Sequence, residues 1–451
     1  MILSRLKVRN NINIVEQADI KLDGLTVIAG ENGSGKSTVG KLLFSTVKAV
    51  SNLNSVKQDY KQKTITKYVE SIYKRVSSSR FRLNASILND VFPMPYYRLI
   101  DKFMAIYNDE VLDQETKCAQ YHEIIDKMIS TINNIDEFTP RIKKLIQDDL
   151  NNIAICLEET DNLAADLATE IKYLIESEFM NRICSFNTSE SHVRLQLDNK
   201  ETAPHVVEYN LTDDEIKGTK VKIDLAESLD DATYIESPLY IHLLDSLLSA
   251  STFREISDKR RIGLKPMIPV HIKDIAEKIN AARYIHEDDI QELMIDDKGA
   301  FVFKDRSLYY QKDGVLYSPI NVASGLKAFG LIQLLLETNV INERKMLIWD
   351  EPENHLHPKW QVAFASVLVD LAKNGVPVVI STHSPYFVQG IRYFAAKQDI
   401  EKYVNYYLAE KQDVNSLATI KDVTTDLNQI FVKLATPLNE IMNVDEIRKN
   451  K

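Results

Sequence analysis

A glycine-rich stretch constrains the fold of this chain more than any other feature. It reads VIAGENGSGKSTVGKLL over residues 27–43 and matches the pattern GxxxxGK[ST] from Gly30 to Ser37. The residues before Gly30 are apolar, as in a buried strand, and those after Gly35 have helical spacing. A strand, a tight glycine loop and a helix in this order predict a phosphate-binding loop. The alternative interpretation is a glycine-rich turn without a ligand.

The residue types of the loop suit a nucleotide. Glycines let the backbone fold tightly, so that successive N–H groups point at phosphate oxygens. The ammonium of Lys36 is expected at the β- and γ-phosphates, and the hydroxyl of Ser37 is expected on magnesium. The predicted nucleotide-binding residues of the loop are Gly30, Glu31, Asn32, Gly33, Ser34, Gly35, Lys36, Ser37 and Thr38.

A second motif supplies what hydrolysis needs besides a phosphate cradle. In MLIWDEPENHLHP an apolar run ends at Asp350, which places this carboxylate at the carboxyl edge of a buried parallel strand. Asp350 is predicted to hold magnesium together with Ser37. Glu351 is predicted to orient or deprotonate the attacking water, as a catalytic residue.

Composition and charge favour a soluble protein. The chain has 451 residues, which is long enough for two or three domains. Its hydrophobic content is 44% and its net charge is −10. We expect a cytoplasmic protein without a membrane partner. The amino terminus lacks an apolar signal core, the apolar runs are shorter than the ~18 residues of a spanning helix, and the three cysteines form no CxxC pair.

The chain is expected to fold as an α/β P-loop nucleotide hydrolase with an inserted helical region. The head is predicted to combine residues 1–45 and 191–395, in which hairpin strands are expected at 191–225 and 299–318. Residues 46–190 are polar and helical in pattern and are predicted to form the insertion. Residues 396–451 are predicted to be a tail whose amphipathic helix packs on the head.

Four segments together resemble a known family. GENGSGKST, ASGLKAFG, WDEPENHLHP and ISTHSP, in that order, resemble the ATP-binding-cassette head of the SMC, RecF and OLD-type ATPases. The resemblance implies a fold with an ABC-type head, the cofactors ATP and Mg²⁺, and hydrolysis of ATP to ADP and phosphate. It also implies that Ser324 and Gly325 contact the γ-phosphate bound to a second subunit, and that His383 senses the γ-phosphate as a catalytic switch residue.

The chain departs from this family in two places. Its signature segment, VASGLK, differs from the LSGGQ of transporters. The glutamine of the family's Q-loop has no clear counterpart, and Glu236 and Ser237 in YIESPLYI are the candidates for its position. Both departures, with the long separation of Lys36 from Ser324, argue against a transporter cassette.

Two functional hypotheses follow from the resemblance. In the first, the chain resembles the ATPase subunits of anti-phage defence systems such as Septu and PARIS. It would then be a homo-oligomeric ATP switch that controls a separate effector, a nuclease or a toxin, because too few residues follow His383 for a nuclease domain. In the second, it is a DNA-repair or chromosome-maintenance ATPase that clamps double-stranded DNA. The basic segments Lys57–Arg82 and Arg254–Lys265 favour the second, although a solvated helix face is the simpler interpretation of both.

Overall fold

The computed structural model divides the chain into two compact units. The larger comprises residues 1–51 and 163–451, and the smaller comprises residues 52–162. The structure describes residues 5–11, 15–78, 92–93, 95–109, 112–135, 138–158, 163–179, 190–197, 205–212, 216–222, 229–248, 268–284, 299–305, 307–413 and 416–442. The basic segment 254–265 lies outside these residues.

The larger unit is built on one large sheet. Its strands are β1 (Arg5–Asn11), β2 (Val15–Lys21), β3 (Leu25–Gly30), β4 (Ser191–Leu197), β5 (His205–Leu211), β6 (Ile216–Lys222), β7 (Asp231–Ile235), β11 (Lys345–Asp350), β12 (Val378–Thr382), β13 (Val404–Lys411) and β14 (Ala418–Asp422). They are arranged in the order β6-β5-β4-β1-β2-β14-β13-β3-β12-β11-β7. A separate three-stranded sheet contains β8 (Ala300–Lys304), β9 (Ser307–Lys312) and β10 (Val315–Tyr317).

The half of the sheet from β13 to β7 is parallel and carries the predicted motifs. β3 pairs in parallel with β12 and β13, and β11 pairs in parallel with β12 and β7. Every residue of β3 and β12 is buried, as expected of strands covered on both faces. Because all these strands run in one direction, Gly30, Asp350 and Thr382 end them at the same edge of the sheet. The predicted α/β fold is confirmed.

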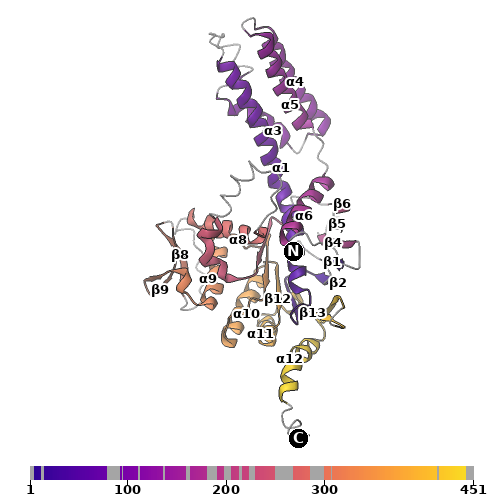
Figure 1. The fold of residues 1–451 in the computed structure, drawn as a ribbon, viewed down its shortest axis with the longest axis vertical. Coiled ribbons are helices and arrows are strands. Elements are labelled where there is room, and N and C mark those ends of the chain that lie inside the picture. The colour runs from indigo at the N-terminus through magenta and orange to yellow at the C-terminus, as the bar shows by residue number, and fades with distance from the viewer. Residues whose placement is uncertain are drawn as a thin grey trace. The chain divides into compact units, whose positions relative to one another are not determined.

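The helices of the larger unit include those that follow the three motif strands. They are the start of α1 (Lys36–Ser78), α6 (Leu163–Phe179), α8 (Val270–Ala281), α9 (Ser324–Glu337), α10 (Pro358–Lys373), α11 (Pro385–Lys397) and α12 (Asn428–Met442), with short 3₁₀ turns η2 (Pro238–Leu243), η3 (Ala282–Tyr284), η5 (Pro319–Asn321) and η6 (Glu401–Tyr403). Figure 1 shows the β8–β9 hairpin beside α9 and shows α10 next to α11. Among these described helices, none is both long and apolar enough to cross a bilayer.

Local sequence explains where α10 and α11 begin. Each has proline at its first helical position, where no N–H is needed. The residues before them are capping residues: Ser384 accepts a hydrogen bond from the backbone of Phe387, and His357 accepts one from Lys359. The dipeptides His-Pro and Ser-Pro in the two motifs therefore mark helix starts.

The carboxyl-terminal segment differs from its expected form, because part of it belongs to the sheet. Residues 404–411 form β13, which pairs with β3 and places Ala409 opposite Gly30. A β-carbon on Gly30 would lie 2.4 Å from the carbonyl oxygen of Ala409. The first glycine of the phosphate loop is therefore required by packing as well as by ligand chemistry. Only α12, with Ile430 buried, matches the expected helix that packs on the head.

The smaller unit is a helical body with its own core. It contains the later part of α1 with α3 (Tyr97–Tyr107), α4 (Gln114–Asn133) and α5 (Pro140–Glu158). Its core is formed by apolar residues from all four helices, among them Ile72, Phe103, Ile125 and Leu150. This unit is narrower than the predicted insertion of residues 46–190, since α6 belongs with the sheet.

Several basic residues of the first predicted basic segment are engaged within this unit. Lys61 is buried, with its ammonium 4.8 Å from the ring centroid of Tyr107. Arg75 forms an ion pair with Asp149. The expected solvated helix face is therefore wrong for Lys61, which is buried, while Arg75 is partly exposed in its ion pair.

We predict that the core between the sheet and α10 depends strongly on Phe364. Its buried ring lies 5.0 Å from that of Phe329 and 5.2 Å from that of Trp349, between centroids. Phe364→Ala should lower the free energy of unfolding by about 3–5 kcal/mol, measured by denaturant titration. Tyr386→Ala, at a side chain 60% exposed, is the matched control and should change it by less than about 0.5 kcal/mol. Equal losses in both variants would contradict this placement of the core.

Candidate active site

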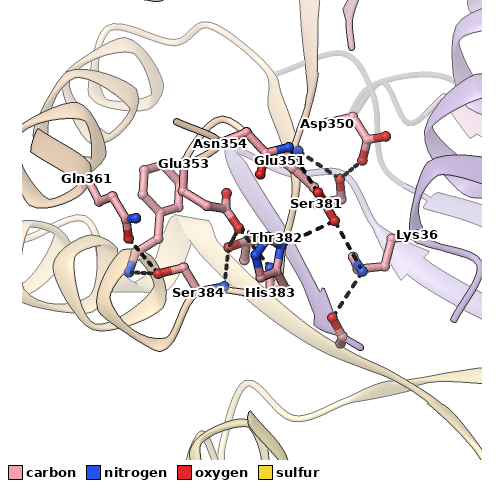
Figure 2. A network of polar contacts seen from close by, with 12 residues as sticks. Lys36, Asp350, Glu351, Glu353, Asn354, Gln361, Ser381, Thr382, His383 and Ser384 are labelled. Carbon is pink, nitrogen blue, oxygen red and sulfur yellow. Dashed lines mark hydrogen bonds and ion pairs between the residues drawn. The ribbon is translucent and has the colours of Figure 1, made fainter. Parts of the chain in front are cut away.

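The motifs meet around one cavity at the carboxyl edge of the parallel strands. The cavity has a volume of ≈ 410 Å³. Among the described residues it is lined by Asn32, Gly33, Ser34, Gly35, Lys36, Ser37, Thr38, Glu236, Asp350, Glu351 and Asn354. Figure 2 shows Glu351 of the second motif next to Lys36, with Asp350 beside Ser381.

The glycine loop is held closed by Lys36. Its buried ammonium donates to the carbonyl oxygens of Gly30 at 3.0 Å and of Glu31 at 2.9 Å. Gly33 and Gly35 have φ angles of +74° and +86°, which favour glycine because a β-carbon is strained there. Gly30 and Glu31 thus do not line the cavity themselves, but they position the lysine that does.

The loop fits a phosphate group on evidence from the structure itself. The hydroxyl oxygen of Ser34 is buried and has no hydrogen-bond partner among the described residues. A β-carbon on Gly33 would meet nothing within 4 Å, so the space in front of the loop is open. Lys36 supplies a buried positive charge beside it, and the helix α1 begins there with its positive dipole end. These features match a cradle for a polyphosphate.

Asp350 is fixed by hydroxyl donors on both oxygens. Ser381 donates to one carboxylate oxygen, and Tyr234 donates to the other at 3.1 Å. Burial raises the pKa of Tyr234 well above its ordinary value, and the nearby Asp350 charge adds to this, so the phenol stays protonated as a donor. Asp350 is the residue that would hold Mg²⁺ together with Ser37.

The cavity fits magnesium better than a metal held only by protein side chains. Ser37 and Asp350 offer the hard oxygen atoms that Mg²⁺ prefers, and both line the cavity. No group of three or more histidine, cysteine or acidic side chains able to hold a metal occurs among the described residues. An ion here would take its remaining ligands from phosphate and water.

Glu351 lies between the side chains of Lys36 and His383. Its Oε1 is 3.7 Å from the ammonium of Lys36 and 3.3 Å from Nδ1 of His383. Its other oxygen accepts a hydrogen bond from Asn354 at 3.0 Å. The backbone at Glu351 is left-handed, with a φ of +47°, a conformation that costs about 1 kcal/mol or more for a residue with a side chain. The chain turns sharply here and directs this carboxylate into the cavity.

Glu353 is a buried carboxylate that sequence reasoning missed. Its Oε1 accepts hydrogen bonds from the hydroxyl of Thr382 at 2.6 Å and the backbone N–H of His383 at 2.8 Å. Its Oε2 has no partner among the described residues, and burial raises the pKa of Glu353. The group holds the strand end that carries His383 (Figure 2). In the sequence, the only indication of this buried carboxylate is that Glu353 follows three residues after Asp350.

Glu236 and Ser237, the two candidates for the position of the missing glutamine, differ in where they lie relative to the cavity. It directly follows β7, the strand next to β11, and it lines the cavity. Ser237, the other candidate, instead caps the 3₁₀ turn η2 by accepting a hydrogen bond from Leu239. Of the two candidates, only Glu236 faces the site.

The structure does not bring Ser324 and Gly325 into the cavity of their own chain. They begin α9, whose capping residue Ala323 provides no side-chain hydrogen bond to the first amides. Gly325 packs against the motif that carries Glu351, since a β-carbon there would lie 2.9 Å from Leu356 and 3.1 Å from Trp360. The helix tip is therefore fixed to the site's own loop, yet outside the cavity.

We predict that Glu353 costs stability when it is ionised. Its folded-state pKa is above that of the unfolded chain, so the destabilisation is absent at low pH and develops as pH rises through the folded value. Glu353→Gln keeps an acceptor oxygen without the charge. The variant should unfold at a higher temperature than the wild type at pH 8, and the difference should shrink towards pH 4. A lower midpoint for the variant at pH 8 would contradict this assignment.

Part of the chain is similar to a phage protein, and the chain as a whole is similar to solved head domains. A segment of 86 residues is 37% identical to protein ea59 of Escherichia phage lambda, and it covers 19% of this chain and 16% of that protein. The SMC head domain from Thermotoga maritima has 11% identity and a TM-score of 0.35, covering 94% of this chain and 99% of its own. The Smc head domain with an extended coiled coil from Pyrococcus furiosus has 10% identity and a TM-score of 0.38, covering 98% and 100%.

Similarity to solved structures at this level says nothing about activity. The family comes from another comparison, in which a model described as an AAA ATPase domain matches residues 1–388. That range includes the glycine loop, the strands β3, β11 and β12, and His383, and it supports ATPase activity in general. Since the match covers most of the 451 residues, the chain belongs to the AAA ATPase domain family.

Proposed function

We propose that this chain binds and hydrolyses ATP as a homo-oligomeric switch, and that the ATP-bound assembly controls a separate effector protein in anti-phage defence. The observation that carries the switch is the position of Ser324. The cavity holds the phosphate loop and the acidic residues for hydrolysis, while the signature helix tip lies outside it. A site assembled from two chains accounts for both facts.

The cavity residues have distinct roles in this proposal. Lys36 and the amides of the loop bind phosphate, and Ser37 and Asp350 hold magnesium. Glu351 orients the attacking water and accepts its proton, because it is the acidic side chain between Lys36 and His383. His383, 42% exposed at its side chain, is accessible to sense the group in front of Glu351. When bound, Mg²⁺ would supply positive charge next to the phosphates, and ATP would supply the bond that is hydrolysed.

The start of α9, which has no side-chain cap, supports a second copy as partner. A helix start without a side-chain cap presents N–H groups and a positive dipole end, which suit an anion. The tip contacts the Leu356 segment, which continues to Glu351 through Asn354. In the assembly, Ser324 and Gly325 would close over the nucleotide of the partner, so that hydrolysis loosens the contact.

The inserted helical unit supports a role that goes beyond hydrolysis. It has its own buried core, which gives the ATPase a second body able to receive a partner. The effector, a nuclease or a toxin, and the defence role come from the resemblance of the motifs. The alternative, an ATPase that clamps double-stranded DNA in repair or chromosome maintenance, remains the competing proposal.

We predict opposite effects for two variants of the cavity. Glu351→Gln should bind ATP and accumulate as an assembly, because the nucleotide persists without its base. Lys36→Ala should lose ATP binding by at least about 100-fold, since the loop loses its buried charge. Light scattering after size exclusion and titration with a fluorescent ATP analogue measure both effects. Lys345→Ala, at the opposite end of β11, is the control and should behave as the wild type.

The shared-site proposal fails if the oligomeric state does not depend on ATP in the wild type and in Glu351→Gln. Ser324→Arg adds a specific check, because it should block assembly without changing ATP binding to the single chain. Loss of ATP binding in Ser324→Arg would instead indicate that the signature residues serve their own cavity.

We further predict that defence depends on the ATPase site. Cells carrying the gene with its neighbouring genes should reduce plaque formation, and Lys36→Ala should abolish the protection. A neighbouring nuclease or toxin gene agrees with this expectation. Salt-dependent binding of duplex DNA, lost when Arg260 and Arg261 are neutralised, would favour the DNA-clamping alternative instead.

A further inference from the structure

His271 lies buried between two carboxylates, one of which lines the cavity. It stands in the first turn of α8 with none of its surface exposed. Its Nδ1 is 2.5 Å from an oxygen of Glu178, and its Nε2 is 3.0 Å from an oxygen of Glu236. A neutral imidazole has one N–H and can donate to one of these carboxylates, whereas an imidazolium donates to both. The geometry fits the charged form.

The titratable groups around this histidine lie on α6, α1 and η2 and directly after β7. Glu178 ends α6 and also accepts a hydrogen bond from the backbone N–H of His271 at 3.0 Å. Lys41 on α1 lies 3.9 Å from Glu236, and the hydroxyl of Tyr240 in η2 donates to Glu236 at 3.2 Å. Burial alone lowers the pKa of His271, but its hydrogen bonds to the two carboxylates outweigh burial and the Lys41 charge, so the pKa is raised.

The same contacts act on Glu236 in the opposite direction. The hydrogen bond from His271 is the main cause that lowers the pKa of Glu236 to about 2. Glu236 is therefore an anion at every pH where the protein would work, although it stands near the acidic residues Asp350 and Glu351. Without a cation behind it, a third carboxylate in one wall would be repelled by the others.

His271 also touches the support of Asp350. Its ring meets that of Tyr234 edge to face, with centroids 5.0 Å apart, and Tyr234 donates its hydroxyl to Asp350. His271 therefore contacts the cavity carboxylate of Glu236 directly, and it packs against Tyr234, the residue that donates to Asp350.

We propose that His271 is a positioning residue of the ATPase site, which holds the Glu236 carboxylate in the cavity wall and ties it to Glu178 at the end of α6. This inference rests on the proposed ATP hydrolysis. Glu236 then orders water in the cavity by accepting hydrogen bonds. Because α6 begins at Leu163, directly after the last residue of the inserted unit, a displacement of Glu236 is passed to the helix that follows the insertion.

Two conservative variants separate the two hydrogen bonds. The amide nitrogen of glutamine can take the place of Nε2, so His271→Gln keeps a donor towards Glu236. The amide nitrogen of asparagine can take the place of Nδ1, so His271→Asn keeps a donor towards Glu178 only. His271→Asn should lower kcat by about 10–100-fold while the Kd for ATP changes by less than about 3-fold. His271→Gln should retain most of the wild-type kcat.

A third variant tests the charge. Glu178→Gln removes one of the two anions that favour the imidazolium, so the alkaline limit of the kcat–pH profile should move to lower pH. The thermal unfolding midpoint without nucleotide gives a readout independent of activity. The folded pKa of His271 is above its unfolded value, so its stabilisation is present below about pH 6.5 and is lost as pH rises through the folded pKa. This loss should be absent in His271→Gln.

Three results would overturn the proposal. One is a kcat and pH profile of His271→Asn equal to those of the wild type. Another is the same pH dependence of unfolding in His271→Gln and the wild type, which means that no charge is held there. The third is a parallel loss of midpoint, ATP binding and kcat in both variants, which means a purely structural role. If the wild-type protein does not hydrolyse ATP, the proposed function is wrong. The unfolding measurements still show in that case whether His271 is charged.

Discussion

The ammonium group of Lys36 organises the site. It bonds to the carbonyls at the end of β3, and it lies within ion-pair distance of Glu351, which follows β11. A buried cation needs acceptors on every side, and these are supplied by the strand edge it closes. The loop, the helix start and the acidic motif are thereby brought to one point before any ligand binds, which lowers the cost of ordering them on binding.

Four carboxylates lie around Lys36 or support the residues next to it, and each has a different environment and role. Asp350 is fixed by two hydroxyl donors and stays available for an ion. Glu351 is partly exposed between Lys36 and His383, while Glu353 is buried behind His383, with a raised pKa. Glu236 is held as an anion by a buried histidine. Different surroundings give one residue type different roles, as in other sites that combine several acids.

Each of the two compact units has its own buried core. The parallel half of the sheet is buried on both faces and gives the site a rigid edge. The helical unit has a core of its own, formed by the later part of α1 with α3, α4 and α5. Within the larger unit, His271 links Glu178 of α6 to Glu236 beside the cavity, and α6 is the first described helix after the insertion in sequence.

The sequence by itself determined the parts of the site that depend on neighbouring residues. The glycine loop, the strand ends at Asp350 and Thr382, and the Pro-marked helix starts are local patterns, and the structure has all of them. Only the tertiary structure decided the rest. β13 enters the sheet beside β3 from nearly 400 residues away in sequence, and it fixes Gly30 by close approach. His271 meets partners 93 and 35 residues away, and Glu353 differs from any surface acid only by its burial. Such contacts join segments that carry no mutual signal in their own residues, because chain topology sets which strand or helix packs beside which.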